Sequence, residues 1–143
     1  MSLDLTGKHV VVTGGAGALG AAVVERLEAA GAICHIPRYE EGIDLTSEES
    51  AVGWFGQLTE LWASVHVAGG FAMSPLTETS LDAFMHQLRM NMVTSFLASR
   101  EAVKLMRKSG GQGRIVNVAA RPVLVPTGGM VSYTASKGGV AAM

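Results

Sequence analysis

The sequence has little charge, a single cysteine and no long apolar run. Charged residues make up 16% of its 143 residues, and 11 Lys and Arg against 12 Asp and Glu leave a formal net charge of -1. This balance provides no basic field for nucleic acid or an anionic membrane, so a small molecule is the expected partner. With one cysteine, Cys34, the chain can form neither an internal disulfide nor a CxxC motif.

Signals for export and for membrane insertion are also missing. The N-terminal segment MSLDLTGKHVVVTGG has no basic region followed by a long apolar stretch, and nowhere do about 18 apolar residues follow one another. The histidines have no spacing typical of metal ligands, so no metal site is expected. We therefore expect a soluble, cytoplasmic protein, and its 48% apolar content excludes intrinsic disorder.

Glycine, in contrast, is abundant, with 18 residues, and segments of strand and helix periodicity alternate between glycine-rich turns. We predict strands at 9–13, 32–38, around Asp44, at 62–67 and at 114–119. Helices are predicted at 19–30, from 46 or 47 toward 60, over 80–108 with a break near Asn91, and from about 132 onward. This alternation favours an α/β fold with a doubly wound parallel sheet and helices on both faces. Ligands of such sheets bind beyond the carboxyl ends of the strands.

The first predicted strand runs directly into the segment TGGAGALG and then into a helix. Gly14, Gly17 and Gly20 allow backbone N–H groups to approach a pyrophosphate, and the following helix adds the partial positive charge of its N-terminus. The strand before the glycines and the helix after them favour dinucleotide binding over a plain tight turn.

Tyr133 and Lys137 are four residues apart at the start of the last predicted helix, and therefore share one helix face. Such a pair also occurs on ordinary helix surfaces. In the functional interpretation, the ammonium lowers the pKa of the phenol from about 10, which makes the phenol a usable acid–base group near neutral pH.

Taken in order, TGGAGALG, IDLT, the Ala-Gly pair at 68–69, MNMVTSF and YTASK resemble the motifs of the short-chain dehydrogenase/reductase family over essentially the whole chain. The resemblance implies a Rossmann-type fold, NADP or NAD as cofactor, and hydride transfer between the nicotinamide and a carbonyl or alcohol substrate. Three residues are implied to be catalytic: Tyr133 exchanges a proton with the substrate oxygen, Lys137 binds the nicotinamide ribose, and Asn91 supports a proton relay. The residues implied to contact the cofactor are Gly14, Ala16, Gly17, Leu19, Gly20, Arg38, Asp44, Leu45, Ala68, Gly69, Gly70, Asn91, Tyr133 and Lys137.

The sequence departs from the family pattern at functional positions. Ala120 stands where the family has a serine that hydrogen-bonds the substrate oxygen, and losing such a donor costs about 2.7 to 4 kcal/mol of transition-state stabilisation. His66 and Val67 replace the two asparagines of the family's NNAG segment, and His66 is expected to be a buried strand residue. At the end of the second strand, Arg38 favours NADP over NAD because a guanidinium suits a 2′-phosphate.

These departures leave two functions open. The first is an oxidoreductase with weak or narrow activity, in which Arg121 or Thr127 supplies the missing donor. The second is a dinucleotide-binding or regulatory protein with little or no catalysis. By the resemblance, helices at 85–108 and from 132 onward pair copies of the chain into a homodimer or homotetramer. Residues 1–143 are interpreted as a single nucleotide-binding domain, cut short after the YxxxK motif and lacking the family's last strands and substrate-covering segment.

Overall fold

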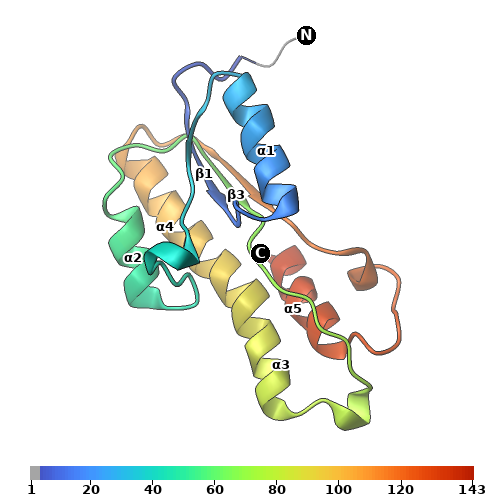
Figure 1. Cartoon of the computed structure of the whole chain (residues 1–143). Coiled ribbons are helices and arrows are strands. Elements are labelled where there is room, and N and C mark those ends of the chain that lie inside the picture. Colours follow the sequence, from blue (N-terminus) through green and yellow to red (C-terminus); the bar gives the residue numbers. More distant parts are fainter. Residues whose placement is uncertain (1–3) are drawn as a thin grey trace.

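The computed structural model describes residues 4–143, which form a parallel sheet with helices on both of its faces (Figure 1). The strands lie in the order β2-β1-β3-β4, with bounds β1 His9–Thr13, β2 Ile33–His35, β3 Ala63–His66 and β4 Arg114–Asn117. The helices are α1 Ala18–Ala29, α2 Glu48–Phe55, α3 Leu81–Leu88, α4 Thr94–Lys108 and α5 Val131–Ala142. Short 3₁₀ turns lie at Tyr39–Glu41, Leu76–Glu78 and Arg121–Val123. The predicted α/β class with a parallel sheet is confirmed.

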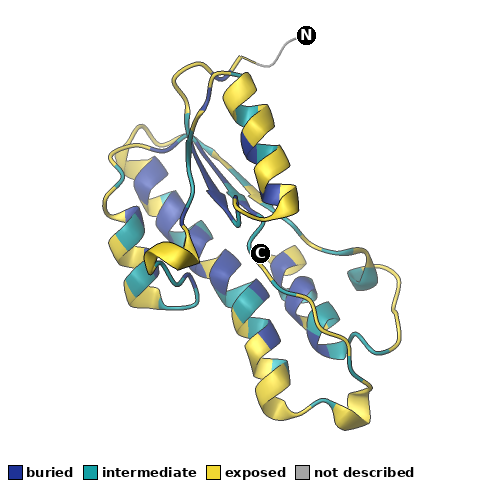
Figure 2. Ribbon diagram, in the orientation of Figure 1, coloured by how far each residue is buried: buried dark blue, intermediate teal, exposed yellow. Residues whose placement is uncertain are grey.

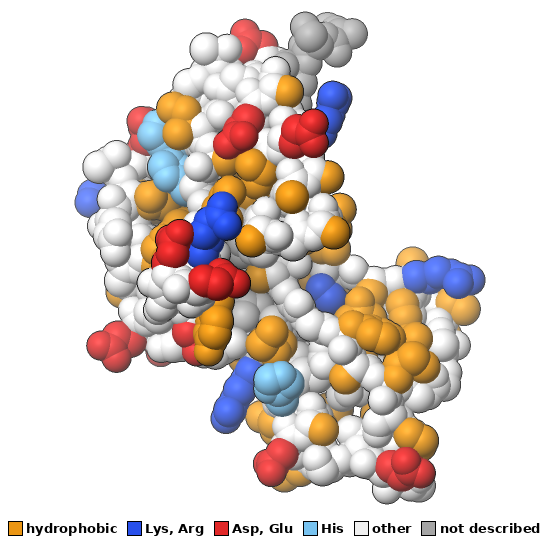
Figure 3. All heavy atoms as spheres, viewed as in Figure 1, with side chains coloured by type: hydrophobic (Ala, Val, Ile, Leu, Met, Phe, Trp, Pro, Cys, Tyr) orange, Lys and Arg blue, Asp and Glu red, His pale blue; other side chains and the backbone are white. Residues whose placement is uncertain are grey.

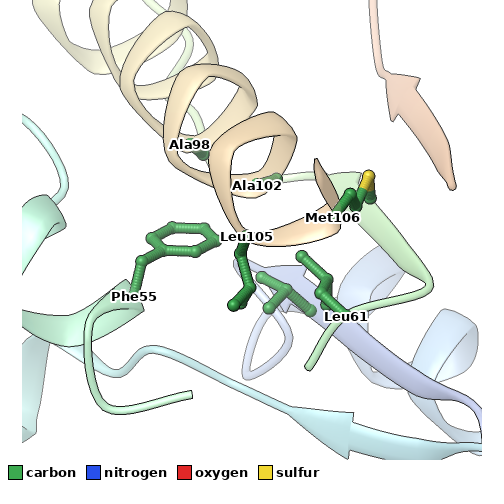
Figure 4. Close-up of a cluster of buried hydrophobic side chains, with 7 residues drawn as sticks. Phe55, Leu61, Ala98, Ala102, Leu105 and Met106 are labelled. Carbon is green, nitrogen blue, oxygen red and sulfur yellow. The ribbon is translucent and has the colours of Figure 1, made fainter. Parts of the chain in front are cut away.

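β1 is buried on both faces because its side chains alternate between two apolar clusters. Val10 and Val12 belong to the cluster on the side of α1, together with Val24 of that helix. Val11 belongs to the cluster on the other side, where α2 and α4 cover the sheet. Its neighbours there are Phe55, Leu61, Ala98, Ala102, Leu105 and Met106 (Figure 4). A run of consecutive valines thus serves both layers, as expected of a central strand in a parallel sheet.

The strand predicted around Asp44 is wrong. Asp44 lies in a turn, where its Oδ1 accepts hydrogen bonds from the Thr46 backbone N–H at 2.8 Å and from the Thr46 hydroxyl at 2.7 Å. Its own N–H donates to the Ser50 hydroxyl at 2.9 Å instead of to a neighbouring strand. An aspartate that closes a local turn in this way competes with sheet pairing. The sheet of the described residues therefore has four strands, and residues 114–117 form the fourth.

Several predicted elements are present but shorter than expected. α2 begins where predicted, because the Ser47 hydroxyl accepts a hydrogen bond from the Ser50 N–H at 3.4 Å. It ends at Phe55 rather than near Glu60. Gly56 follows, and tight turns then close with hydrogen bonds from Gln57 to Trp54 and from Leu58 to Phe55. The strands predicted at 32–38, 62–67 and 114–119 likewise lose residues at their ends, where the chain leaves the ladder.

The break predicted near Asn91 is a π-helical turn. Helix α3 begins after Ser80, whose hydroxyl caps the Ala83 N–H at 3.1 Å, and α4 ends at Lys108. Between them, Arg89–Val93 form a single π turn with Asn91 at its centre. Such turns insert one extra residue and are frequent at functional sites. This turn directs Asn91 into the interior, where the residue is fully buried.

The chain order creates a switch point between β1 and β3. From β1 the chain passes by way of α1 to β2 on one side, and then crosses back by way of α2 to β3 on the other side. Figure 1 shows the strands pointing toward a lower lobe that α3 and α5 build. In Figure 2 the central strands β1 and β3 are largely buried, whereas α1 and α3 expose much of their outer faces. Among residues 4–143, no helix has the length and hydropathy needed to cross a membrane.

We predict that Leu105→Ala lowers the free energy of unfolding by about 2 to 5 kcal/mol, because it opens a cavity in the cluster between α4 and β1. Urea denaturation followed by circular dichroism measures the change. Leu124→Ala is the matched control, since Leu124 is 84% exposed whereas Leu105 is 7% exposed. The control should change the free energy by no more than about 0.5 kcal/mol. Equal effects of the two substitutions would contradict this account of the core.

Candidate active site

The turn after β1 is closely packed around two glycines. Gly14 has a φ of +69°, and a Cβ added to it would come within 2.7 Å of the Ala68 backbone nitrogen. A Cβ added to Gly20 would overlap the Gly14 carbonyl oxygen. Gly17 precedes α1 and donates its N–H to the same carbonyl at 3.0 Å. Helix α1 has neither a side-chain cap nor an acidic residue in its first turn, so no such group competes with an anion for its first N–H groups.

A groove of about 520 Å³ runs from this turn along the carboxyl ends of the strands. It brings together seven of the residues predicted to contact a cofactor, namely Gly14, Ala16, Arg38, Asp44, Leu45, Ala68 and Gly69. The sequence interpretation missed the others, which follow β2 or lie on the helix stripe around the π turn. They are Pro37, Tyr39, Glu40, Ile43, Thr46, His86, Arg89, Met90 and Thr94. His86, Met90 and Thr94 have helical spacing, and this spacing was the signal that could have placed the three residues on one helix face.

Arg38 and Asp44 line the groove at the end of β2. The Arg38 guanidinium lies on the surface, 3.7 Å from Glu41 Oε1. One oxygen of Asp44 holds the turn with Thr46 described above, and Leu45 buries its side chain beside Ala51 and Leu97. This packing ties the otherwise irregular segment after β2 to helices α2 and α4.

Asn91 connects the groove to α5 through its side-chain amide. Its Oδ1 accepts the Gly70 N–H at 2.8 Å, and its Nδ2 donates to the Gly70 carbonyl at 3.0 Å and to the Ser136 hydroxyl at 2.8 Å. Ser136 in turn donates to the Tyr133 carbonyl at 2.7 Å. Position 69 requires a glycine, because a Cβ there would overlap Asn91 Oδ1 and would lie 3.5 Å from Lys137 Nζ. The amide therefore holds the end of the groove against the first turns of α5.

The sequence interpretation missed three side chains of this network. Gln87 is buried and donates a second hydrogen bond to the Gly70 carbonyl. Thr13, the last residue of β1, accepts the Ala68 N–H on its hydroxyl at 3.2 Å. Ser136 is fully buried under Asn91. Gln87 and Asn91 are four residues apart, and that spacing was the available signal for Gln87.

Tyr133 and Lys137 lie on one face of α5, as predicted. Lys137 is buried, and its Nζ donates to the Val118 carbonyl at 2.8 Å. Burial lowers the pKa of the Lys137 ammonium because the charged form loses solvation. The ring of Phe71 meets the ring of Tyr133 edge to face, with centroids 4.9 Å apart. Phe71 directly follows Gly70, so it belongs to the segment that Asn91 holds.

The remaining predicted residues lie at the start of α1. Gly17 and Gly20 shape its first turn, and Leu19 is 55% exposed on its surface. Ala120 is half-buried just before the 3₁₀ turn that follows β4. Neither suggested replacement donor is hydrogen-bonded to Tyr133 within residues 4–143, and the Thr127 hydroxyl donates to the Val125 carbonyl at 3.3 Å. The same described residues contain no group of three or more His, Cys, Asp or Glu side chains that could hold a metal ion.

Known proteins are similar to this chain in sequence. The 2,5-dichloro-2,5-cyclohexadiene-1,4-diol dehydrogenase LinX of Sphingobium indicum is 30% identical, over 100% of this chain and 66% of that protein. The 3beta-hydroxysteroid dehydrogenase 2 of Eggerthella lenta is 25% identical, over 93% of this chain and 61% of that protein. The chain thus spans between 61% and 66% of the length of these relatives.

Similarity extends to solved structures and to a family model. The structure of NAD+-bound xylitol dehydrogenase superposes with a TM-score of 0.89 at 25% identity, covering 96% of this chain and 62% of that one. Residues 43–143 match the family model for short chain dehydrogenases. This segment runs from the turn at Asp44 through Asn91 to Lys137, and so includes most of the site. The chain belongs to the short-chain dehydrogenase family.

Proposed function

We propose that this chain is part of an NADP- or NAD-dependent oxidoreductase that transfers hydride between the nicotinamide and an alcohol or carbonyl carbon. The observation that carries the proposal is the Asn91 amide, which joins Gly70, the residue after the groove-lining Gly69, to Ser136 of α5. Tyr133 and Lys137 do not line the groove themselves, but a Cβ on Gly69, which does line it, would lie 3.5 Å from Lys137 Nζ. A protein that only bound a dinucleotide would have little need for this set of side chains.

The residues present fit a dinucleotide. A Cβ on Gly14 or Gly20 would meet the protein's own backbone, so these two glycines shape the turn. A Cβ on Gly17 would meet only the Gly14 carbonyl oxygen at 3.4 Å, so the backbone at Gly17 is open to the approach of a pyrophosphate. The uncapped N-terminus of α1 would add its partial positive charge. Asp44 and Ala68 would hold the adenosine part, and Lys137 would bind the nicotinamide ribose. A bound nicotinamide supplies or accepts the hydride.

Tyr133 is the group that we propose to exchange a proton with the substrate oxygen. In carbonyl reduction its phenol gives its proton to the substrate oxygen and becomes a phenolate, and in alcohol oxidation the phenolate takes the hydroxyl proton and becomes a phenol. The buried ammonium of Lys137, anchored on the Val118 carbonyl, lies one turn along the same helix face. A cation on this face would stabilise the negative charge that develops on the substrate and tyrosine oxygens during the transfer.

The wall beside Tyr133 supports a cyclic, mainly apolar alcohol as substrate. Phe71 packs edge to face on the tyrosine ring and is 59% exposed, and Met73 of the same segment is 56% exposed. Both side chains are therefore free to contact a ligand. Figure 3 shows hydrophobic side chains gathered over the lobe of α5 and its neighbouring loops. The names of the relatives LinX and 3beta-hydroxysteroid dehydrogenase 2 refer to alcohols on carbon rings. These names agree with a cyclic, mainly apolar substrate.

We predict that the chain binds NADP more tightly than NAD, because Arg38 can release Glu41 and pair with the more highly charged 2′-phosphate. Arg38→Ala should weaken NADP binding about tenfold and leave NAD binding unchanged. Titration calorimetry with both dinucleotides measures the affinities. Arg107→Ala, the same charge change at the far end of α4, is the control. Tighter binding of NAD by the unchanged chain would overturn the assignment.

We predict that Tyr133→Phe lowers turnover by about 10² to 10⁴-fold, because the acid–base group is lost. Cofactor affinity should stay close to that of the unchanged chain. The assay follows the absorbance of the reduced nicotinamide with a panel of cyclic and open-chain secondary alcohols and their ketones. Full activity of the variant would refute the role of Tyr133. Cofactor binding without turnover by the unchanged chain would instead support the binding or regulatory function.

We predict that Ala120→Ser raises kcat/KM by up to about 10² to 10³-fold, because it supplies a hydroxyl donor for the substrate oxygen. The neighbouring substitution Ala119→Ser is the matched control and should have no effect. Steady-state kinetics on the best substrate of the panel measures both variants. Equal rates for Ala120→Ser and the unchanged chain would show that another group already fills this role.

A further inference from the structure

A buried polar cluster lies directly beneath the site, between β3, β4 and α4. Its centre is His66, the last residue of β3, with an exposed fraction of 1%. His66 Nδ1 lies 2.7 Å from Asn117 Oδ1 and 3.3 Å from Ser99 Oγ. On the other side of the ring, His66 Nε2 lies 2.8 Å from Ser64 Oγ. Both ring nitrogens therefore have partners.

The partners determine the protonation state of His66. Asn117 Oδ1 can only accept, so Nδ1 carries the proton and Nε2 accepts the Ser64 hydroxyl proton. Burial lowers the pKa of His66, which keeps the ring neutral. Burying these polar groups costs free energy. A valine at position 66 would avoid this cost, as the valines of β1 do, because it has no polar group.

The cluster is linked to Lys137 through the end of β4. His66 and Asn117 are register partners, the last pair of the β3–β4 ladder. The next residue, Val118, donates its N–H to the His66 carbonyl at 3.3 Å. The Val118 carbonyl accepts the Lys137 ammonium at 2.8 Å. Thus the imidazole holds the strand end from which the lysine is anchored.

We propose that His66 is a positioning residue, whose imidazole pairs with Asn117 to set the Val118 carbonyl that anchors Lys137. The effect of the placement of Lys137 on a reaction rests on the proposed function above. The placement of Lys137 by His66 does not rest on that function. Small errors of placement are costly in such sites, since a displacement of about 1 Å can lower a rate about 10²-fold.

The test compares substitutions that separate placement from stability. His66→Leu keeps most of the volume and removes both ring nitrogens. His66→Asn offers an amide nitrogen in place of Nδ1, and so keeps the bond to Asn117 while leaving a void beside Ser64. Asn117→Ala breaks the same pair from the other side. Leu105→Ala destabilises the core away from this cluster and serves as the matched control.

The main readout is the ¹³Cε–¹Hε NMR signal of Lys137 in the unliganded chain, assigned by its loss in Lys137→Arg. We expect this signal to move toward the positions of exposed lysines in His66→Leu and Asn117→Ala, and to stay in place in His66→Asn and Leu105→Ala. Melting temperatures should fall in all four variants. With a substrate in hand, kcat should fall about tenfold to 10²-fold in His66→Leu, and His66→Asn should restore it.

The readouts keep the two proposals apart. An unmoved Lys137 signal in both His66→Leu and Asn117→Ala would overturn the positioning role, and so would an equal shift in Leu105→Ala. If His66→Leu does not fold, Asn117→Ala and His66→Asn decide the question. Absence of turnover in the unchanged chain would count against the proposed oxidoreductase, while the NMR signal would still test the link from His66 to Lys137.

Discussion

The side-chain amide of Asn91 bonds to the Gly70 peptide, 21 residues earlier, and to the Ser136 hydroxyl, 45 residues later. Both the N–H and the carbonyl of Gly70 bond to this one amide, whose residue is fully buried. A buried polar group left without a partner costs about 1 to 3 kcal/mol, so the three segments keep their places together. The groove, α5 and the π turn depend on this contact, because no apolar packing could specify the same alignment.

The local geometry around Asn91 follows from that constraint. A regular α-helix over 81–108 would present its side chains at a constant angle, whereas the π turn adds one residue and redirects Asn91 to the interior. The turn leaves carbonyls poorly paired, and the Thr94 hydroxyl donates to those of Met90 at 2.8 Å and Asn91 at 3.2 Å. Gly69 completes the arrangement, since a side chain there would occupy the position of the amide oxygen.

Apolar and polar burial have different tasks in this molecule. The valines of β1 and their clusters hold the sheet between two layers without directional contacts. Polar residues end three of the strands at their carboxyl ends: Thr13 and His66 are buried and Asn117 is half-buried. Directional hydrogen bonds at these ends determine the positions of the loops that form the groove. The site is therefore built on a rigid apolar base and aligned by polar contacts above it.

Much of the fold and part of the site followed from the sequence. The buried strand at 9–13, the glycine turn after it, the break at Asn91 and the shared face of Tyr133 and Lys137 were predicted, because periodicity, capping and turn chemistry act between near neighbours. The same reasoning misjudged Asp44, where a side-chain turn replaced a strand.

The hydrogen-bond partners of Gln87 and Ser136 and the pairing of His66 with Asn117 could not be predicted in this way. Their partners lie between 17 and 51 residues away along the chain. The sequence by itself determined the alternation of strands and helices and named the residues that we propose to carry the chemistry. Only the tertiary structure decided which polar groups meet, because hydrogen bonds between distant residues exist only once strand order and helix packing have made those residues neighbours.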